Sequence, residues 1–193
     1  PTIPMSYVYP RIPVKDMFLG HAVTKGSRPY IILDDIVLNY QTSNMIARKF
    51  ANALLGLGVK KGDRVGLMAA NIPQYILALQ ACFKIGAIAV PANPLYTVDE
   101  IIHQFKDCEA ETIVVMAMFA DKVIEAKKSG KTSIKNIISI QLASLPVDMT
   151  GKDVIDFNEL TGKGEDKEPE VEVTADDIAM LQYTGGTTGV SKG

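Results

Sequence analysis

Apolar and polar positions follow two different periods along most of the chain. Short apolar or β-branched runs predict strands, and longer segments with apolar residues at helical spacing predict helices. Strands are expected at residues 65–69, 87–90, 112–116 and 136–140, and helices at residues 46–57, 73–86, 97–108 and 119–129. Strands separated by helices of about ten or more residues are typical of a parallel sheet. The pattern therefore predicts an α/β fold, a mostly parallel sheet with helices on both of its faces.

Local signals mark the ends of these helices. Gly56 and Gly58 end the first helix, Pro73 suits the first turn of the second, and Gly130 closes the fourth. Residues 97–100 read Thr-Val-Asp-Glu, which predicts a capping box at the start of the third helix. That helix is expected to bury Ile101, Phe105 and Cys108.

The beginning of the chain departs from this alternation. Residues 1–27 are spaced by prolines and predict an extended N-terminal arm with a short helix near residues 16–23. Residues 28–193 are expected to form an α/β subdomain. It opens with a hairpin, because apolar runs at residues 30–33 and 36–40 flank an Asp-Asp turn.

A second departure lies between residues 142 and 177, where the helix–strand rhythm stops. The stretch 162–170 is charged and rich in helix breakers, so it is expected to be an exposed loop. Asp176 and Asp177 then lead into an apolar run at residues 178–181, which predicts the last strand. We interpret these aspartates, like Asp34 and Asp35, as turn residues and not as metal ligands.

Composition limits the class of protein. The chain has 193 residues, is 47% apolar and 22% charged, and carries a net charge of −2, as ordinary soluble proteins do. It has no basic excess for nucleic acid, no segment long enough to span a membrane and no signal-peptide core. We expect a cytoplasmic protein, with peripheral membrane contact and a homodimer left open. Since the chain lacks an initial methionine and stops within a motif, a piece of a longer protein is expected.

The two cysteines and two histidines are not expected to be catalytic or metal-binding residues. Cys82 and Cys108 lie in predicted helices without metal-ligand spacing, so buried thiols are expected, with a redox pair as the alternative. His21 and His103 are interpreted as packing or surface residues. Met116 and Met118 are expected to fill the core. Three lysines of the fourth helix could touch phosphate groups of a ligand, but a solvated face is the preferred interpretation (Lys122, Lys127 and Lys128).

The last residues of the chain are rich in glycine and hydroxyl side chains. The apolar run at 178–181 leads into Tyr183-Thr184-Gly185-Gly186-Thr187-Thr188-Gly189-Val190-Ser191-Lys192-Gly193. Glycines let several N–H groups approach an anion, hydroxyls donate to phosphate oxygens, and a lysine adds a mobile positive charge. We expect a phosphate-binding loop beyond the carboxyl end of a strand, where α/β sheets bind ligands.

This loop fits neither of two common nucleotide-binding patterns. In the P-loop pattern G-x-x-x-x-G-K-[ST], a glycine precedes the lysine, but Ser191 precedes Lys192 and Gly193 follows it. The dinucleotide pattern G-x-G-x-x-G fails because Gly185 and Gly186 are adjacent. A flexible tail without function is the plain alternative.

The loop resembles the phosphate-binding signature of the adenylate-forming superfamily, which includes acyl-CoA synthetases, luciferases and peptide-synthetase adenylation domains. Its common form is T-S-G-T-T-G-x-P-K-G. This chain departs from that form at Gly185, where serine is usual, and at Ser191, where proline is usual. The first departure removes one hydroxyl donor but leaves the threonines and the lysine in place.

Five further stretches are similar to the same superfamily and cover the chain from about residue 28 onward. They are Ile36–Tyr40, Leu57–Val65 (L-G-V-x-K-G-D-R-V), Asn71–Gln74 (N-x-P-[EQ]), Lys84–Ala87 (K-x-G-A) and Pro91–Thr97 (N-P-x-[YF]-T). Among the branches, the chain looks most like bacterial or archaeal fatty acyl-CoA ligases. The resemblance implies the amino-terminal part of the large domain of an acyl-CoA synthetase-like fold.

The resemblance also implies a reaction. A carboxylic acid attacks the α-phosphorus of Mg²⁺-bound ATP to give an acyl-adenylate and pyrophosphate, and the thiol of CoA then displaces AMP. The site residues implied for binding the phosphates are Thr184, Gly185, Gly186, Thr187, Thr188, Gly189 and Lys192. Lys192 is expected to be a charge clamp and not a base. Neither catalytic nor metal-binding residues are expected within this chain.

Other functions stay open at this stage. The adenine, magnesium and acyl sites of the family lie downstream of the loop, so this piece alone is expected to be inactive and to need the missing C-terminal part of the same protein. An aryl acid such as a coumarate, or a luciferin-like acid, is an alternative substrate. A non-catalytic ATP-binding module and an interaction domain are the alternatives from other classes.

Overall fold

A five-stranded parallel sheet forms the centre of the molecule. The computed structural model describes residues 9–184. The strand order is β4-β3-β5-β6-β7, and each neighbouring pair is parallel. The strands are β3 (Arg64–Met68), β4 (Ile88–Pro91), β5 (Thr112–Met116), β6 (Asn136–Ile140) and β7 (Ile155–Asp156). The predicted fold class is confirmed, and the first four of these strands lie within one residue of their predicted starts.

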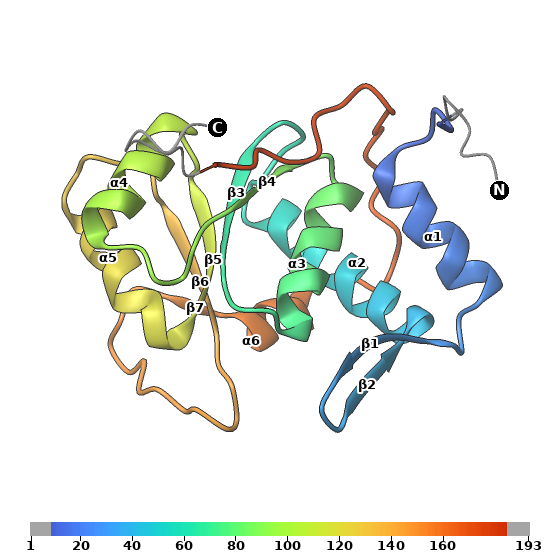
Figure 1. Ribbon diagram of the computed structural model, residues 1–193, viewed down its shortest axis with the longest axis horizontal. Coiled ribbons are helices and arrows are strands. Elements are labelled where there is room, and N and C mark those ends of the chain that lie inside the picture. The colour runs from blue at the N-terminus through green and yellow to red at the C-terminus, as the bar shows by residue number, and fades with distance from the viewer. Residues whose placement is uncertain (1–8, 185–193) are drawn as a thin grey trace, which may run out of the picture.

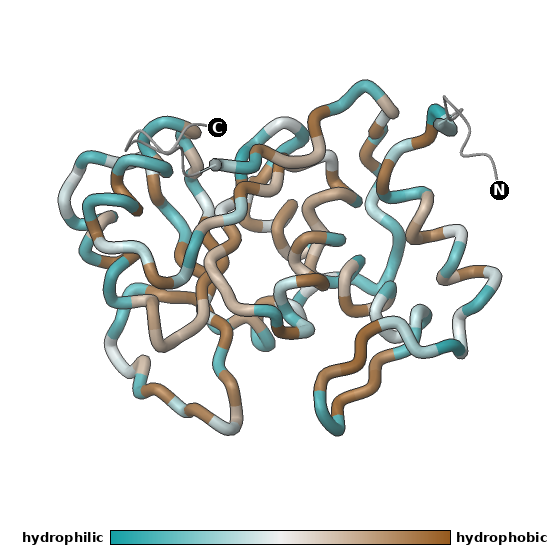
Figure 2. The backbone as a smooth tube through the Cα atoms, in the orientation of Figure 1, coloured by the Kyte–Doolittle hydropathy of each residue, from teal (hydrophilic) through white to brown (hydrophobic). Residues whose placement is uncertain are grey.

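Side chains of the central strands alternate between two apolar cores. Val114 and Met116 face one core, whereas Ile113 and Val115 face the other. Successive residues of a strand point to opposite faces of the sheet. Because both faces are apolar, the strands read as continuous hydrophobic runs, which is typical of a parallel sheet covered on both sides. In Figure 2, the central strands are coloured mostly brown, the colour of hydrophobic residues.

Helices cover both faces (Figure 1). One core contains residues of α2 (Tyr40–Gly56), α3 (Pro73–Lys84) and α6 (Phe157–Lys163). The other contains residues of α4 (Val98–Asp107) and α5 (Ala120–Lys128), which a short 3₁₀ helix, η1 (Ala117–Phe119), precedes. Gly66 in β3 allows close packing of α4, because a Cβ there would lie 2.7 Å from Cε1 of Phe105.

The capping signals act as predicted. The Thr97 side chain accepts a hydrogen bond from the amide of Glu100, and the Glu100 side chain accepts one from the amide of Thr97. Pro73 is the first residue of α3, and Gly130 follows α5 with φ +68°. The capping-box helix buries Ile101 and Phe105 completely.

A hairpin and a helix precede the sheet. The predicted hairpin consists of β1 (Pro29–Leu33) and β2 (Ile36–Asn39), which pair antiparallel. Helix α1 (Val14–Thr24) is longer than the short helix expected there, and its Phe18 ring lies 4.9 Å from the ring of Tyr30. The division of the chain at residue 27 stays a prediction.

The structure corrects the expectation for residues 142–177. This region contains β7 and α6, which the pattern did not predict. A two-residue strand has too little periodicity to detect, while α6 begins at a local cap: Asp156 accepts hydrogen bonds from the amides of Asn158 and Glu159. Most residues of 162–170 are exposed, as expected, but residues 162 and 163 belong to α6. The segment after them packs on α2 and α3, and Pro169 is buried.

Two smaller expectations also change. Met118 is 50% exposed and does not fill the core, whereas Met116 is buried. The last strand, expected at residues 178–181, is reduced to a single parallel bridge between Met180 and Ala89.

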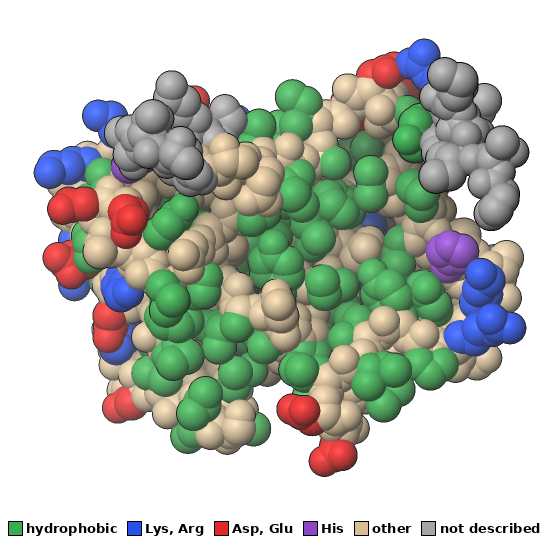
Figure 3. Space-filling view, in the orientation of Figure 1, with side chains coloured by type: hydrophobic (Ala, Val, Ile, Leu, Met, Phe, Trp, Pro, Cys, Tyr) green, Lys and Arg blue, Asp and Glu red, His purple; other side chains and the backbone are tan. Residues whose placement is uncertain are grey.

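Apolar surface remains outside the two cores. Large side chains of the hairpin are exposed (Ile32, Ile36 and Val37), and so are Leu95 and Ile178. In Figure 3, apolar side chains gather across the middle of the face shown, and most charged ones lie toward its sides.

Both cysteines are buried free thiols, as expected. Burial raises the pKa of Cys82 to about 12 and also raises the pKa of Cys108. Since the thiolate is the reactive form, we expect both thiols to react with a disulfide reagent at about pH 8 far more slowly than free cysteine does. Absorbance of the released thiol measures this. Denaturant should restore the reaction of both, and rapid labelling of native Cys82 would contradict the packing of α3.

Candidate functional site

Of the predicted phosphate-binding residues, only Thr184 lies within the described part of the chain, and it is exposed. Gly185, Gly186, Thr187, Thr188, Gly189 and Lys192 lie outside the described residues. The structure therefore shows what holds the segment that leads into the loop. We call residues 173–184 the stem; it is the red segment that crosses above β4 toward α4 in Figure 1.

The stem begins at a turn tied down by two aspartates. Asp176 accepts two hydrogen bonds from the Arg11 guanidinium, at 2.8 and 2.9 Å. Asp177 accepts a hydrogen bond of 2.6 Å from the amide of Thr174 and forms an ion pair of 2.7 Å with Lys61. These contacts lower the pKa of Asp177. Both carboxylates therefore have structural partners, which agrees with their interpretation as turn residues.

The middle of the stem pairs with the edge of the sheet. The amide of Ala89 donates to the carbonyl of Ala179 at 3.0 Å, and the amide of Leu181 donates to the carbonyl of Ala89 at 2.9 Å. This single bridge makes the stem a neighbour of β4, running in the same direction.

The end of the stem is held by Tyr183. Its side chain is 8% exposed and belongs to the apolar core beside α4, together with Val90 and Phe105. Its hydroxyl donates a hydrogen bond to Oδ2 of Asp107, the last residue of α4. Burial raises the pKa of Tyr183, and the hydrogen bond to Asp107 raises it further, so the hydroxyl keeps its proton.

The contact with Asp107 lies on the side of the sheet where the strands begin. Helix α4 leads from the carboxyl end of β4 back to the start of β5. Consistently, Arg64 at the start of β3 donates from Nε to the carbonyl of Cys108 at 2.6 Å. The position of the loop beyond a carboxyl end stays a prediction, because its residues lie outside the described part.

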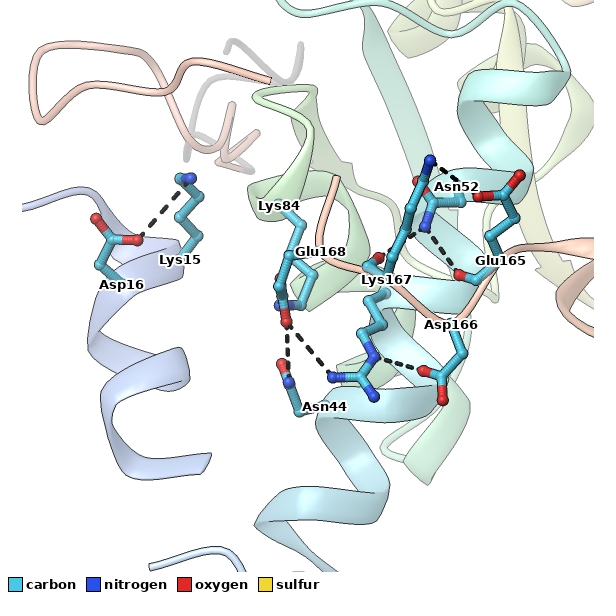
Figure 4. A network of polar contacts seen from close by, with 10 residues as sticks. Lys15, Asp16, Asn44, Asn52, Lys84, Glu165, Asp166, Lys167 and Glu168 are labelled. Carbon is cyan, nitrogen blue, oxygen red and sulfur yellow. Dashed lines mark hydrogen bonds and ion pairs between the residues drawn. The ribbon is translucent and has the colours of Figure 1, made fainter. Parts of the chain in front are cut away.

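A polar network fixes the segment between α6 and the stem (Figure 4). The buried Lys84 ammonium, 2% exposed, lies 2.6 Å from Glu168, whose other carboxylate oxygen accepts a hydrogen bond from Asn44. Arg48 forms an ion pair with Asp166. Burial lowers the pKa of Lys84, and Glu168 offsets part of that effect. These contacts tie residues 165–168 to α2 and α3.

The motifs that carry the resemblance form turns and caps in the described chain. Gly58 and Gly62 have φ of +91° and +85°, which an L side chain adopts only with strain. The amide of Gly62 donates to the carbonyl of Gly86 at 2.8 Å, which joins two of the motifs. Asn93 accepts from the amide of Leu95 just before the capping box. These residues shape the scaffold around the stem.

The remaining candidates have ordinary roles. The His21 ring lies 5.8 Å from the ring of Tyr40, and His103 is exposed on α4. Lys122 donates to the carbonyl of Tyr96 at 2.9 Å, and Lys127 forms an ion pair with Asp153 at 2.6 Å. Neither of these two lysines is therefore a simple solvated side chain.

Cavities and charges elsewhere in the described chain show no built ligand site. A polar hollow of about 720 Å³ lies at the amino ends of β3, β5 and β6. Four of its charged groups pair with each other, Arg64 with Glu109 and Lys135 with Glu111. No group of three metal-ligating side chains occurs among residues 9–184. Over the same residues, every helix is too short or too polar to cross a membrane.

Sequence reasoning missed the residues that anchor this region. Tyr183 and Asp107 are 76 positions apart, and Lys84 and Glu168 are 84 apart. Neither pair leaves a local signal in the sequence, because the two partners come into contact only when the chain folds.

Comparisons with known proteins support the resemblance. The profile of the AMP-binding enzyme family matches residues 19–193. The chain is 35% identical to a long-chain-fatty-acid--CoA ligase of Salmonella typhimurium, over 90% of this chain and 34% of that protein. It is 31% identical to a 4-coumarate--CoA ligase of Vanilla planifolia, over 99% of this chain and 34% of that protein. The chain thus spans about a third of these curated relatives.

Solved structures agree with the fold. A long-chain-fatty-acid-CoA ligase from Archaeoglobus fulgidus superposes with a TM-score of 0.81 at 27% identity, covering 96% of this chain and 37% of that one. An anthranilate CoA ligase in complex with anthranoyl-AMP gives a TM-score of 0.83 at 23% identity, over 95% of this chain and 34% of that one. The second similarity concerns the fold alone.

Proposed function

This chain belongs to the AMP-binding enzyme family, and we propose that the complete protein is a fatty acyl-CoA ligase. It activates a long- or medium-chain fatty acid with ATP to an acyl-adenylate and transfers the acyl group to CoA. The observation that carries the proposal is the glycine- and threonine-rich sequence, with one lysine, that directly follows the anchored stem. Similarity to a long-chain-fatty-acid--CoA ligase over 90% of the chain supports it.

The chemistry explains the composition of the loop. When a carboxylate attacks the α-phosphorus of ATP, the bond to the bridging oxygen breaks and negative charge develops on the departing pyrophosphate. Backbone N–H groups near Gly185 and Gly186, the threonine hydroxyls and the Lys192 ammonium stabilise that charge. Mg²⁺, when bound, neutralises part of the triphosphate charge; no residue of this chain is assigned to it.

Other parts of the protein complete the reaction. The adenine, acyl and CoA sites are proposed to lie in the part of the protein that this chain does not contain. The 193-residue chain alone is therefore expected to make no acyl-CoA. Measurable synthesis by it would contradict the proposed location of these sites. A cytoplasmic location and a possible homodimer belong to the same proposal.

An aryl acid is the second candidate substrate, because the similarity to a 4-coumarate--CoA ligase extends over 99% of the chain. Carboxylate-dependent exchange of pyrophosphate into ATP by the complete protein separates the candidates. Acids from acetate to palmitate and 4-coumarate are supplied one at a time. Exchange only when an acid is present establishes adenylation, and the best acid identifies the substrate class. ATP binding without exchange for every acid would favour a non-catalytic ATP-binding module.

The role of Lys192 has its own test in the same assay. Replacing Lys192 with alanine removes one preorganised positive charge from the leaving pyrophosphate, and we expect the exchange rate to fall about 10²-fold. Lys131→Ala is the matched control, because Lys131 is an exposed lysine far along the chain from the loop. Equal exchange rates in the two variants would remove Lys192 from the phosphate site.

A further inference from the structure

The tip of the β1–β2 hairpin, residues 32–37, exposes apolar side chains that belong to strands. Ile32, Ile36 and Val37 are 68%, 50% and 56% exposed. Ile32 and Val37 are directly opposed in the antiparallel pair, so their side chains share one face of the hairpin. Ile36 is opposed to Leu33 and therefore lies on the other face, beside the turn. The tip is thus apolar on both of its faces.

The base of the hairpin is fixed to the rest of the molecule. The Tyr30 hydroxyl accepts a hydrogen bond of 3.2 Å from the Gln80 side chain on α3, and the Tyr30 ring lies 4.6 Å from the ring of Tyr40. The amide of Tyr40 donates to the carbonyl of Arg28 at 3.1 Å and closes the base. In Figure 1, the tip projects from this base at the lower edge of the view. A fixed projection of this kind needs little reordering when it contacts another surface.

Within residues 9–184, the tip has no strand beside it apart from its own hairpin. Strands β1 and β2 form a two-stranded sheet, so each strand has an open outer edge. A hairpin of two strands alone is marginally stable in water, and natural sheets usually have their open edges protected or covered. The turn adds two exposed carboxylates, those of Asp34 and Asp35. A surface that covers the tip therefore needs apolar groups for its faces and hydrogen-bond donors or positive charges near its turn.

Three kinds of surface could cover an apolar hairpin tip, and two of them fit poorly. A lipid bilayer offers no hydrogen-bond partners for open strand edges, and anionic headgroups repel the two carboxylates of the turn. A stable dimer of two copies needs about 20–30 residues on each side, far more than the tip contains. A part of the same polypeptide needs no such area, because its covalent link supplies a high effective concentration. The observations therefore favour a partner within the same protein.

The curated relatives contain further protein that can supply this partner, since the chain spans 34% of each of the two compared above. We propose that the hairpin tip is the docking element for the part of the complete protein that this chain does not contain. Apolar side chains of that part cover Ile32 and Val37, and donor groups face Asp34 and Asp35. The proposal goes beyond the ligase reaction, because it rests on the length of the complete protein and not on which acid the protein activates.

The test is thiol labelling of the complete protein with a maleimide, at one position of the tip and at one control position. Ile32→Cys places the thiol in the tip, and Lys131→Cys places it in the exposed turn after α5. Both native cysteines of this chain are buried, and mass spectrometry of the labelled peptides identifies the position that reacted. The thiol of Ile32→Cys should react about tenfold more slowly than that of Lys131→Cys, and denaturant should equalise the two rates.

The dependence on protein concentration separates the two kinds of protein partner. Slow labelling of Ile32→Cys that persists in very dilute protein supports docking within one polypeptide. Labelling that becomes fast on dilution would assign the tip to a second copy and overturn the proposal. Equal rates for Ile32→Cys and Lys131→Cys in the native protein would overturn it as well, because the tip would then be open to solvent.

A second measurement keeps the side-chain shape and does not rely on labelling. Val37→Thr retains the β-branched shape of valine but adds a hydroxyl, which a dry interface disfavours. Val23→Thr is the matched control on α1, where Val23 is 77% exposed. The midpoint of thermal unfolding should fall by a few degrees in Val37→Thr and stay constant in Val23→Thr, and equal midpoints would contradict docking. If the complete protein lacks acid-dependent exchange, the proposed function fails, whereas the labelling ratio tests the docking by itself.

Discussion

Replacing Gly164 with alanine should destabilise the protein by about 4 kcal/mol or more, or detach the segment that follows α6. A Cβ at this position would lie 1.8 Å from the carbonyl oxygen of Lys49 and 2.7 Å from its carbonyl carbon. Both atoms belong to the backbone inside α2, which cannot move aside. Since Gly164 has φ −75° and ψ 144°, which any residue adopts, the cost is purely one of space.

Gly162→Ala is the matched control, two residues earlier. Gly162 lies in α6, and a Cβ added there would have no atom within 4 Å, so alanine should fit. Because alanine is the better helix former, this variant should be neutral or more stable by up to about 1 kcal/mol. Denaturant unfolding of both variants measures the difference. Similar midpoints would show that residue 164 does not lie against α2.

The second large effect is expected for Glu168→Gln, which should lower the free energy of unfolding by about 3 kcal/mol. The change preserves the size of the side chain but leaves the buried Lys84 ammonium without its counter-charge. Glu165→Gln is the control, because Glu165 pairs with Lys167 on the surface, where side chains are 69% and 57% exposed. Such exposed pairs contribute little, so less than about 0.5 kcal/mol should be lost.

The loss of unfolding free energy in Glu168→Gln, called the deficit below, should depend on pH. Burial lowers the pKa of Lys84 below its ordinary value of 10.5, and removal of the carboxylate lowers it further. Between the folded and unfolded pKa values the unfolded chain binds more protons, so the free energy of unfolding rises with pH. The deficit should therefore shrink as pH rises from neutral toward the unfolded pKa of lysine. A deficit independent of pH would mean that Lys84 carries the same charge in the variant as in the wild-type protein.

The parallel sheet and its helices were predictable because their signals are local. The run at Thr112–Met116 is apolar or β-branched at every position, and the capping box lies within four consecutive residues. A parallel sheet covered on both faces leaves this trace in any sequence, since both sides of each strand must be apolar. The turns at Gly58 and Gly62 were visible for the same reason.

The parts that escaped prediction depend on contacts between distant residues. The charges at positions 165–168 predicted an exposed loop, yet Asp166 pairs with Arg48 and Glu168 pairs with Lys84, and nothing local indicates these two contacts. The apolar run at 178–181 suggested a full strand, but it forms one bridge at the edge of the sheet. Of the candidate site, the composition of the loop could be read from the sequence, whereas its anchor at Tyr183 needed the fold.

The ion pair of Lys84 and Glu168 has a consequence for synthesis on the ribosome. The two residues are 84 positions apart, so Glu168 emerges roughly 4 to 17 seconds after Lys84 at about 5–20 residues per second. During that interval a charged lysine has no partner and stays in water, which keeps the end of α3 from docking fully. The nascent chain therefore reaches its final packing only after the segment beyond α6 has been made.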